Sequence, residues 1–235
     1  MIGVVIPAHN EEEYIEQCLL SVFDAARHPL LNETPVVVTV VLDDCQDRTE
    51  EIALTLGASV AKVNFRNVGS SRAAGADMMI ERGASWLAFT DADTLVPADW
   101  LWRQLDFKTD AVCGIVEVDS WSKYGEKVRD HYIGLYQFTE NHRHVHGANL
   151  GVSVTAYSRA GGFQALATHE DVRLVTDLEA TGACIVWTAT NPVRTSARTD
   201  YRCEEGFGEY LANLAVSLGV IRDDPASRES AEPIG

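Results

Sequence analysis

The sequence has few basic residues, no clustered cysteines and no long hydrophobic run. It carries 19 lysines and arginines against 35 aspartates and glutamates in 235 residues, a formal net charge of −16. An acidic surface repels polyanions, which argues against nucleic acid or an anionic membrane as the main partner. Local positive charges must therefore hold an anionic substrate, because the net negative charge of the whole protein repels it.

No two cysteines stand at metal-binding or redox spacing; they are Cys18, Cys45, Cys113, Cys184 and Cys203. This scatter favours reduced thiols in a cytosolic protein. The longest apolar runs, such as Val36–Leu42, have the length of a strand, so we expect neither a signal peptide nor a membrane span. The sequence predicts a soluble, cytoplasmic protein and leaves homodimer formation open.

Strand and helix patterns alternate along the first part of the chain. Ile2–Ile6 and Val36–Leu42 are typical of buried strands, and each precedes an amphipathic helical pattern. This order predicts a parallel sheet with right-handed crossovers. We expect one α/β domain over residues 1–221 and a disordered tail over residues 222–235.

Capping residues predict where three of the helices begin. Asn10 with Glu13 resembles a capping box, and Asp47 is expected to cap a helix from about Thr49. Thr168 is expected to cap a helix that opens with acidic residues.

Two longer helical patterns follow the strand expected at Ala111–Val118. One runs from about Tyr124 to His142, and the other covers Gly206–Leu218.

The most informative stretch is Trp86–Thr94, where an apolar run leads into Asp91 and Asp93. A buried strand there would end at the carboxyl edge of the sheet, where open α/β folds bind ligands. Two carboxylates at that edge repel each other unless a cation lies between them, and Mg²⁺ carrying substrate phosphates suits such a pair. The alternative is a solvated turn, because Asp-x-Asp is a common sequence.

Two further segments offer ligand contacts. Asp44 follows the second strand, where its carboxylate can accept the ring N–H of a nucleobase. Asn67–Gly75 predicts a loop before a helix, in which Gly69 lets the backbone approach a ligand. Arg72 offers a charged fork to a carboxylate or a phosphate, with a surface ion pair as the alternative.

A histidine-rich segment invites a metal interpretation. His144 and His146 fall on the same side of an extended chain. We favour a basic loop near phosphates or a solvated turn, because no further fixed zinc ligands can be identified.

Three arginines recur at spacings of four after the strand expected at Cys184–Ala189; they are Arg194, Arg198 and Arg202. Asn191 and Pro192 favour a loop here. The segment then either forms a lid over a diphosphate, or its arginines only balance the negative charge of an acidic protein.

Short segments that occur together in one known family span residues 2–182, in that family's order. They are Val4–Glu12, Asp43–Thr49, Asn67–Gly75, Asp91–Asp93, Gly147–Asn149, Gly161–Phe163 and Glu170–Asp171. On these segments the chain resembles a family 2 glycosyltransferase with the GT-A fold. The resemblance implies a single α/β domain, Rossmann-like, with a mostly parallel central sheet flanked by helices. It also implies sugar transfer from a nucleoside diphosphate donor of the UDP or GDP type to an acceptor hydroxyl.

The same resemblance implies roles for individual residues. The nucleotide would be contacted by Pro7, Ala8, His9, Asn10, Asp44, Gly69, Arg72 and Asp91. The donor sugar would lie against Asp91, Gly147, Ala148 and Asn149. Mg²⁺ or Mn²⁺ would be ligated by Asp93, with His169 as a further candidate. Asp171 would be the base for the acceptor hydroxyl, supported by Glu170.

Purely structural roles compete with several of these assignments. Asn149 can serve as a partner for buried backbone groups. Glu170 and Asp171 complement the dipole at a helix start. Trp100 and Trp102 are expected mainly to pack, with contact to a sugar as the second interpretation.

The predicted reaction is a metal-assisted displacement. A divalent ion stabilises the charge that develops on a leaving diphosphate. The resemblance implies direct displacement with inversion, the family's usual course. A single candidate base with no nucleophile opposite it fits that course, and retention, which related folds also show, is the alternative. The alternatives are a nucleotidyltransferase-like enzyme and an inactive nucleotide-sugar-binding domain. The first usually needs a glycine-rich basic loop after the first strand, where this chain has the acidic Asn10–Glu13.

Overall fold

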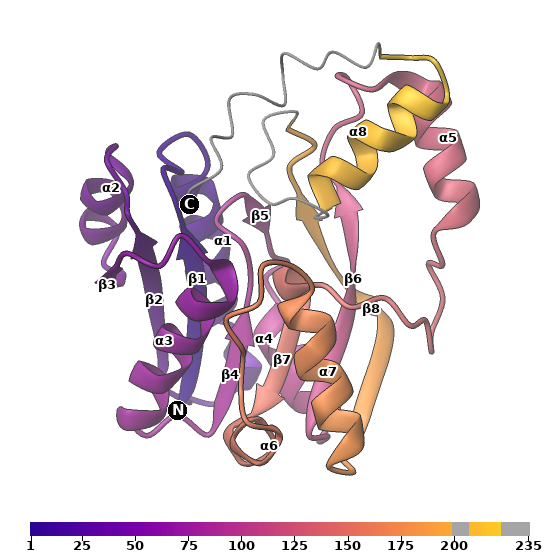
Figure 1. The fold of residues 1–235 in the computed structure, drawn as a ribbon. Coiled ribbons are helices and arrows are strands. Elements are labelled where there is room, and N and C mark those ends of the chain that lie inside the picture. Colours follow the sequence, from indigo (N-terminus) through magenta and orange to yellow (C-terminus); the bar gives the residue numbers. More distant parts are fainter. Residues whose placement is uncertain (199–206, 222–235) are drawn as a thin grey trace. The chain divides into compact units, whose positions relative to one another are not determined.

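The computed structural model describes residues 1–198 and 207–221 (Figure 1). The chain divides into two compact units. The first comprises Met1–Glu117 and Phe138–Thr195, and the second comprises Val118–Gln137 and Ser196–Gly235.

Within the described residues the strands form one sheet in the order β3-β2-β1-β4-β7-β6-β8-β5. Their bounds are β1 (Ile2–Ala8), β2 (Val36–Asp43), β3 (Ser59–Val63), β4 (Trp86–Phe89), β5 (Thr94–Leu95), β6 (Ala111–Val118), β7 (Leu150–Ser153) and β8 (Ile185–Thr195). β1 pairs in parallel with β2 and β4, and β2 pairs in parallel with β3. β7 is antiparallel to both β4 and β6, and β5 is antiparallel to β8.

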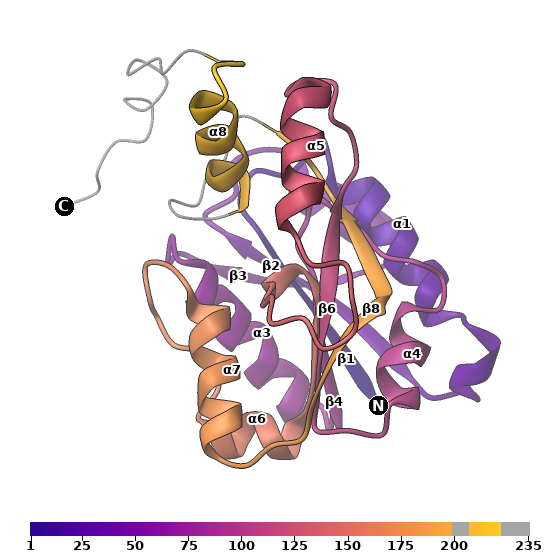
Figure 2. The ribbon, with the colours of Figure 1, turned by 90° about the vertical axis from the view of Figure 1, so that its right-hand side faces the viewer.

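Helices cover both faces of this sheet. In the first unit they are α1 (Ile15–Ala26), η1 (Pro29–Leu31), α2 (Thr49–Thr55), α3 (Val68–Glu81), α4 (Trp100–Asp106), η2 (Gly147–Asn149), α6 (Val154–Ala160) and α7 (Glu170–Ala180). Figure 2 shows α3, α6 and α7 on one face, and α1 and α4 on the other. The predicted α/β architecture is confirmed. The predicted strands at the start of the chain and at Ala111–Val118 are confirmed as well.

The burial of the central strands follows from their position between two helix layers. All four residues of β4 are buried, as the apolar run Trp86–Phe89 predicts. Val5, Val41 and Phe89 belong to one core cluster with residues of α3 and α7. Burial on both faces fixes these strands in place and with them the loops that leave their ends.

The carboxyl ends of β1, β2 and β4 lie at the same edge of the sheet, because these strands are parallel neighbours (Figure 1). β7 runs in the opposite direction and pairs Leu150 with Phe89. The segment that precedes β7, η2, therefore lies at that same edge. This topology gathers segments that are more than a hundred residues apart in the chain.

The first predicted helix start is wrong. α1 begins at Ile15 after Tyr14, and no side chain caps it. Asn10 instead adopts a left-handed backbone conformation, and its side-chain oxygen accepts the Gln46 N–H at 2.7 Å. Asn10 therefore joins the two loops that leave β1 and β2.

Asp47 lies one residue before the cap of α2, which is Arg48 and makes no capping side-chain bond, so the predicted cap is wrong by one residue. α2 begins at Thr49, and the Asp47 carboxylate accepts the Thr49 N–H at 3.0 Å. Its second oxygen accepts the Glu12 N–H at 2.9 Å.

Two further helix starts differ from the predictions. α3 begins at Val68 with Asn67 as its cap, so Gly69 and Arg72 lie in its first turns rather than in a loop. The cap of α7 is His169, in a left-handed conformation and without a capping side-chain bond, rather than the predicted Thr168.

The last strand of the first unit is longer than predicted. β8 extends through Asn191 and Pro192 to Thr195, so Arg194 lies on a strand that pairs with β5 rather than on a loop. The buried side-chain amide of Asn191, which donates to the Trp100 carbonyl at 3.2 Å, helps to hold this extension.

The second unit contains α5 (Gly125–Leu135) and α8 (Phe207–Ser217). α8 confirms the helix predicted near Gly206–Leu218, whereas α5 ends well before the predicted end at His142. Tyr132 of α5 packs its ring against Trp121 and Phe207, with centroids 5.2 and 6.0 Å away. Arg202 and the predicted tail 222–235 lie outside the described residues. In residues 1–198 and 207–221, none of the helices has the length and hydropathy needed to traverse a bilayer.

Candidate active site

Arg72 lies at the centre of the site, where it pairs with two carboxylates. It lies on α3, is 4% exposed, and donates from Nη2 to Asp91 Oδ1 at 2.5 Å and from Nη1 to Glu170 Oε1. Burial alone would lower the pKa of Arg72, but the surrounding carboxylates, led by Asp91 and Glu170, raise it. Its fork is thus paired with two carboxylates, which is the carboxylate alternative of the prediction, in a buried rather than a surface ion pair; a contact between Arg72 and the nucleotide stays a prediction.

The segment before β7 packs directly against this guanidinium. A side chain at Gly147 would clash with the Arg72 guanidinium, so only glycine fits there. The Gly147 N–H donates to Asp171 Oδ2 at 2.7 Å, and the Val172 N–H donates to Asp171 Oδ1 at 2.7 Å. Asp171 is half-buried, and both of its oxygens are oriented by backbone donors.

Glu170 differs from its neighbour in exposure. It is 5% exposed, and its carboxylate is directed at Arg72. Burial raises the pKa of Glu170, the Arg72 guanidinium lowers it, and Asp171 raises it further, so that the pKa lies above its ordinary value. A buried, paired carboxylate cannot reach an acceptor hydroxyl, so Glu170 is a structural partner of Arg72.

Asp91 and Asp93 lie in the turn after β4 and are both half-buried. Asp93 Oδ1 accepts from the Thr195 hydroxyl at 3.4 Å. The buried thiol of Cys18 donates to the Asp91 carbonyl oxygen at 3.3 Å. Burial first, and then the charges of Asp93 and Asp91, raise the pKa of this thiol.

The carboxylates of Asp91 and Asp93 offer hard oxygen ligands. A divalent ion such as Mg²⁺ takes one or two protein carboxylates and completes its shell with phosphate and water, so it suits this pair. In the described part of the chain, no three His, Cys, Asp or Glu side chains are arranged to hold a metal ion by themselves. His169 is exposed at the start of α7, next to Glu170.

A second cluster surrounds the ends of β1 and β2. His9 Nδ1 lies 2.6 Å from the Asp43 carbonyl oxygen, and its Nε2 lies 2.9 Å from Arg66 Nη1. The same Arg66 nitrogen donates to Asp44 Oδ2 at 3.2 Å, and Gln46 Nε2 donates to Asp44 Oδ1 at 3.2 Å. Of the predicted nucleotide residues, Pro7, Ala8, His9, Asn10 and Asp44 are thus brought together at this edge.

The buried Asp43 organises the loop between the two clusters. Its carboxylate accepts the backbone N–H groups of Phe65, Arg66 and Asn67 at 2.7, 2.9 and 3.0 Å, and the Ser71 hydroxyl at 2.9 Å. Burial raises the pKa of Asp43, but these donors outweigh it and lower the pKa below its ordinary value. Sequence reasoning missed both Asp43 and Arg66. The adjacency of Asp43 and Asp44 was the available signal, since neighbours on a strand face opposite sides.

Gly69 and Asn149, which were predicted to contact a ligand, contact other protein groups instead. A side chain at Gly69 would clash with the Gln164 carbonyl oxygen, so the open face of this glycine receives a protein loop rather than a ligand. The Asn149 amide donates to the Ile115 and Asn191 carbonyl oxygens at 2.9 and 2.7 Å and accepts from Trp100 Nε1 at 2.9 Å. Its amide is fully used in the core, so it does not face a donor sugar.

The histidine-rich segment forms a stack. The rings of His142 and His144 lie 5.4 Å apart, and those of His144 and His146 lie 6.0 Å apart. Burial, with the neighbouring histidines, lowers the pKa of His146 to about 3. His146 is therefore neutral at physiological pH. The segment lies outside helices and strands, as the predicted loop does, but His142 is buried, so the segment is not a solvated turn.

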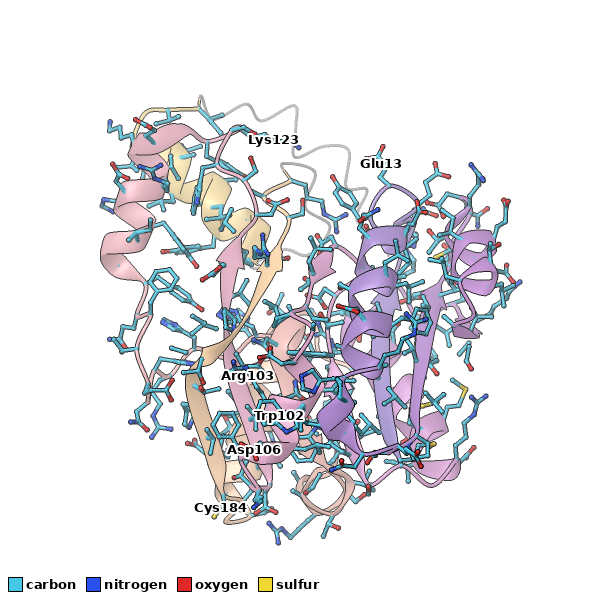
Figure 3. All side chains as sticks on the ribbon, turned by 180° about the vertical axis from the view of Figure 1, so that it is seen from behind. Glu13, Trp102, Arg103, Asp106, Lys123 and Cys184 are labelled. Atoms are coloured by element: carbon cyan, nitrogen blue, oxygen red, sulfur yellow. The ribbon has the colours of Figure 1, made fainter. Side chains whose placement is uncertain are left out.

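The two tryptophans after the acidic turn are packing residues. Trp100 is fully buried. Trp102, labelled on α4 in Figure 3, stacks on His28 with ring centroids 5.5 Å apart.

The chain is similar to known proteins in sequence and in structure. The family model described as Glycosyl transferase family 2 matches residues 3–166. The 4,4'-diaponeurosporenoate glycosyltransferase of Staphylococcus haemolyticus is 36% identical over 97 residues, which are 39% of this chain and 24% of that protein. The chain therefore spans about a quarter of that curated relative.

Solved structures share the fold. TarS 1-349 of S. aureus, in complex with UDP-GlcNAc, superposes with a TM-score of 0.66 at 15% identity, covering 98% of this chain and 70% of the other. The mannosyltransferase PcManGT of Pyrobaculum calidifontis, in complex with GDP-Man and Mn²⁺, gives 0.61 at 17% identity, covering 98% and 68%. These neighbours confirm the predicted glycosyltransferase fold class.

Proposed function

The chain belongs to glycosyl transferase family 2, and on that premise we propose that it transfers a sugar from a nucleoside diphosphate donor to an acceptor hydroxyl with the help of a divalent metal ion. The observation that carries this proposal is the cluster of Asp91, Glu170 and Asp171 around the buried Arg72. It combines a candidate metal-binding turn with a candidate base.

The donor class follows from the family and from what its structural neighbours bind. TarS was solved with UDP-GlcNAc, and PcManGT with GDP-Man and Mn²⁺. We assign the nucleoside to the ends of β1 and β2, with Asp44 accepting the ring N–H of the base and Pro7, Ala8, His9 and Asn10 beside it. The donor sugar is assigned to the edge formed by Asp91, Gly147 and Ala148.

Asp93 and Asp91 are the residues that would hold Mg²⁺ or Mn²⁺, with His169 as a further candidate ligand. When bound, the ion supplies positive charge to the leaving diphosphate. The role of Arg72 in this scheme is to fix Asp91. The buried guanidinium donates one hydrogen bond to Asp91 and another to Glu170, and this bridge restrains the Asp91 carboxylate.

Asp171 is proposed as the general base. Two backbone N–H groups orient its carboxylate. Each of its oxygens retains a further lone pair, which can accept a hydrogen bond from the hydroxyl group of the acceptor substrate. In the proposed step the hydroxyl oxygen bonds to the sugar carbon as the bond to the diphosphate oxygen breaks, and the proton passes to Asp171. With one base and direct displacement, the configuration at that carbon is inverted.

The proposal is tested with the purified protein, a panel of UDP- and GDP-sugars, and Mn²⁺. Thermal shifts identify the donor, because selective binding raises the apparent stability. The selected donor without acceptor should then slowly release free nucleotide, and the release should stop in EDTA. Binding without release under all conditions would instead indicate an inactive binding domain. Pyrophosphate production from a nucleoside triphosphate and a sugar phosphate would indicate a nucleotidyltransferase.

A further inference from the structure

We propose that Thr195 is a positioning residue for the divalent ion: together with Thr94 it forms a relay of two hydroxyl groups that orients the carboxylate of Asp93. The inference rests on the proposed function, because it assumes that Asp91 and Asp93 hold Mg²⁺ or Mn²⁺. Such an ion takes one or two protein carboxylates, so the direction in which each carboxylate points affects how tightly the ion is held.

Two buried hydroxyl groups lead to the Asp93 carboxylate. The Thr94 hydroxyl donates to Thr195 Oγ1 at 3.0 Å, and the Thr195 hydroxyl donates to Asp93 Oδ1 at 3.4 Å. Thr94 is fully buried, and Thr195 is 7% exposed. An ionised carboxylate can only accept, so the single hydroxyl proton of Thr195 points at Asp93, and Thr195 Oγ1 accepts from Thr94. The relay therefore has one direction, from the sheet to the carboxylate.

The relay crosses a pair of strands that holds both threonines in place. Thr94 on β5 lies directly opposite Thr195 on β8 in the antiparallel register. Threonine is branched at Cβ, which restricts its χ1 angle and with it the direction of the hydroxyl group. Hydrogen bonds between threonines on facing strands also support the pairing itself. The register of β5 and β8 thus places a hydroxyl group of defined direction beside Asp93.

The extension of β8 beyond the predicted strand brings Thr195 to the acidic turn, because Thr195 is the last residue of β8. Asn191 lies within this extension and is fully buried. Its side-chain amide donates to the Trp100 carbonyl oxygen at 3.2 Å, and its own carbonyl oxygen accepts from Asn149 Nδ2 at 2.7 Å. These buried bonds anchor the strand four residues before its end and thereby fix the position of Thr195.

The backbone of the acidic turn is held independently of this relay. The Asp91 carbonyl oxygen accepts the Thr94 N–H at 3.1 Å and the Cys18 thiol at 3.3 Å. The Asp91 carboxylate pairs with a guanidinium, whereas the hydroxyl of Thr195 carries no charge. The Thr195 contact therefore restricts the direction of the Asp93 carboxylate without pairing its charge with a protein cation.

The length of the contact indicates where its effect should be measured. At 3.4 Å it is long for a hydrogen bond from a hydroxyl group to a carboxylate, so it adds little to the stability of the fold. Partners that orient a metal-binding side chain typically change the metal affinity about 10–100-fold when they are removed. We therefore expect the loss of the Thr195 hydroxyl to weaken metal binding far more than folding.

The experiment measures the affinity of UDP or GDP, whichever the donor panel selects, by calorimetry in EDTA and at a series of Mn²⁺ concentrations. Thr195→Val removes the hydroxyl and keeps the shape, and it should raise the Mn²⁺ concentration for half of the affinity gain about tenfold. The affinity in EDTA should not change. Thr195→Ser keeps the hydroxyl with a freer χ1 angle and should stay within about threefold of the wild type. Thr94→Val should give a smaller increase than Thr195→Val.

The matched control is Thr188→Val. Thr188 lies on the same strand, is fully buried, and its hydroxyl donates to Glu140 Oε1 at 3.1 Å. This substitution also removes a buried bond from a hydroxyl to a carboxylate, but it should leave the Mn²⁺ dependence unchanged. Melting temperatures in EDTA check that the variants are folded.

An unchanged Mn²⁺ dependence in Thr195→Val, or an equal loss in Thr195→Val and Thr195→Ser, would overturn the inference and leave the proposed function intact. If the valine variant does not fold, Thr195→Ala takes its place in the same comparison with Thr195→Ser. If the wild type gains no affinity from Mn²⁺, the metal dependence in the proposed function itself fails.

Discussion

At the scale of single residues, neighbouring acids at the start of α7 have different environments. Asp171 is half-buried and oriented by two backbone donors, whereas Glu170 is buried against Arg72. An asparagine in place of Asp171 would keep the shape of the side chain but lose its basicity. We therefore expect Asp171→Asn to retain donor binding and lose about 10²–10⁴-fold in kcat. Calorimetry and a turnover assay measure the two effects separately, and near-normal turnover would show that the base lies elsewhere.

Glu170 should instead affect the stability of the fold. Removing one partner of a buried ion pair leaves an uncompensated charge, and such losses are typically about 3–5 kcal/mol. Because Asp91 remains to pair with Arg72, we expect Glu170→Ala to lower the free energy of unfolding by about 2–3 kcal/mol. The exposed Glu179, which pairs with Arg143, is the matched control, and Glu179→Ala should cost less than about 1 kcal/mol. Equal losses in the two variants would contradict the buried role of Glu170.

At the scale of elements, the loop between β3 and α3 depends on one carboxylate. The pKa of Asp43 is lowered from its unfolded value of 3.8, so the ionised form is favoured in the folded state. Its contribution to stability is therefore complete above the unfolded pKa and is lost as the pH falls through the folded pKa. Asp43→Asn also places an amide donor among N–H donors, which costs about 1–3 kcal/mol.

We accordingly expect the difference in melting temperature between wild type and Asp43→Asn to be constant from about pH 8 to pH 5 and to shrink below about pH 4. Asp106→Asn, an exposed substitution on α4 (Figure 3), should give a small difference throughout. A wild-type advantage that persists at pH 2 would show that the Asp43 carboxylate is not the stabilising group.

The elements also differ in how far they could be predicted from sequence. Apolar patterns located β1, β2, β4, β6, the first part of β8 and α2, because burial of an element depends on its local pattern. They did not identify the short strands β3, β5 and β7. The start of α1 was placed wrongly, because Asn10 bonds to Gln46 of another loop. Asn149 was interpreted as a ligand residue, because the carbonyl and indole groups that saturate its amide come from β6, β8 and α4. Arg66 was missed because the Asp43 bonds that direct it are contacts between loops.

At the scale of the whole molecule, a chain with a net charge of −16 must bind an anionic donor. Arg72 does not provide the compensating charge, because Asp91 and Glu170 occupy its guanidinium. Asp91 and Asp93 would add further repulsion if no cation joined them. The account therefore requires that donor binding depends on a divalent ion held by this pair.

The most direct measurement is the affinity of UDP and GDP for the wild type, Asp93→Ala and Asp106→Ala, each titrated in Mn²⁺ and in EDTA. Asp106→Ala removes the same charge from an exposed site on α4. The account predicts that Mn²⁺ tightens binding at least about tenfold in the wild type and in Asp106→Ala, and that Asp93→Ala loses this gain. Equal affinities in Mn²⁺ and EDTA for the wild type, or a full gain in Asp93→Ala, would contradict it.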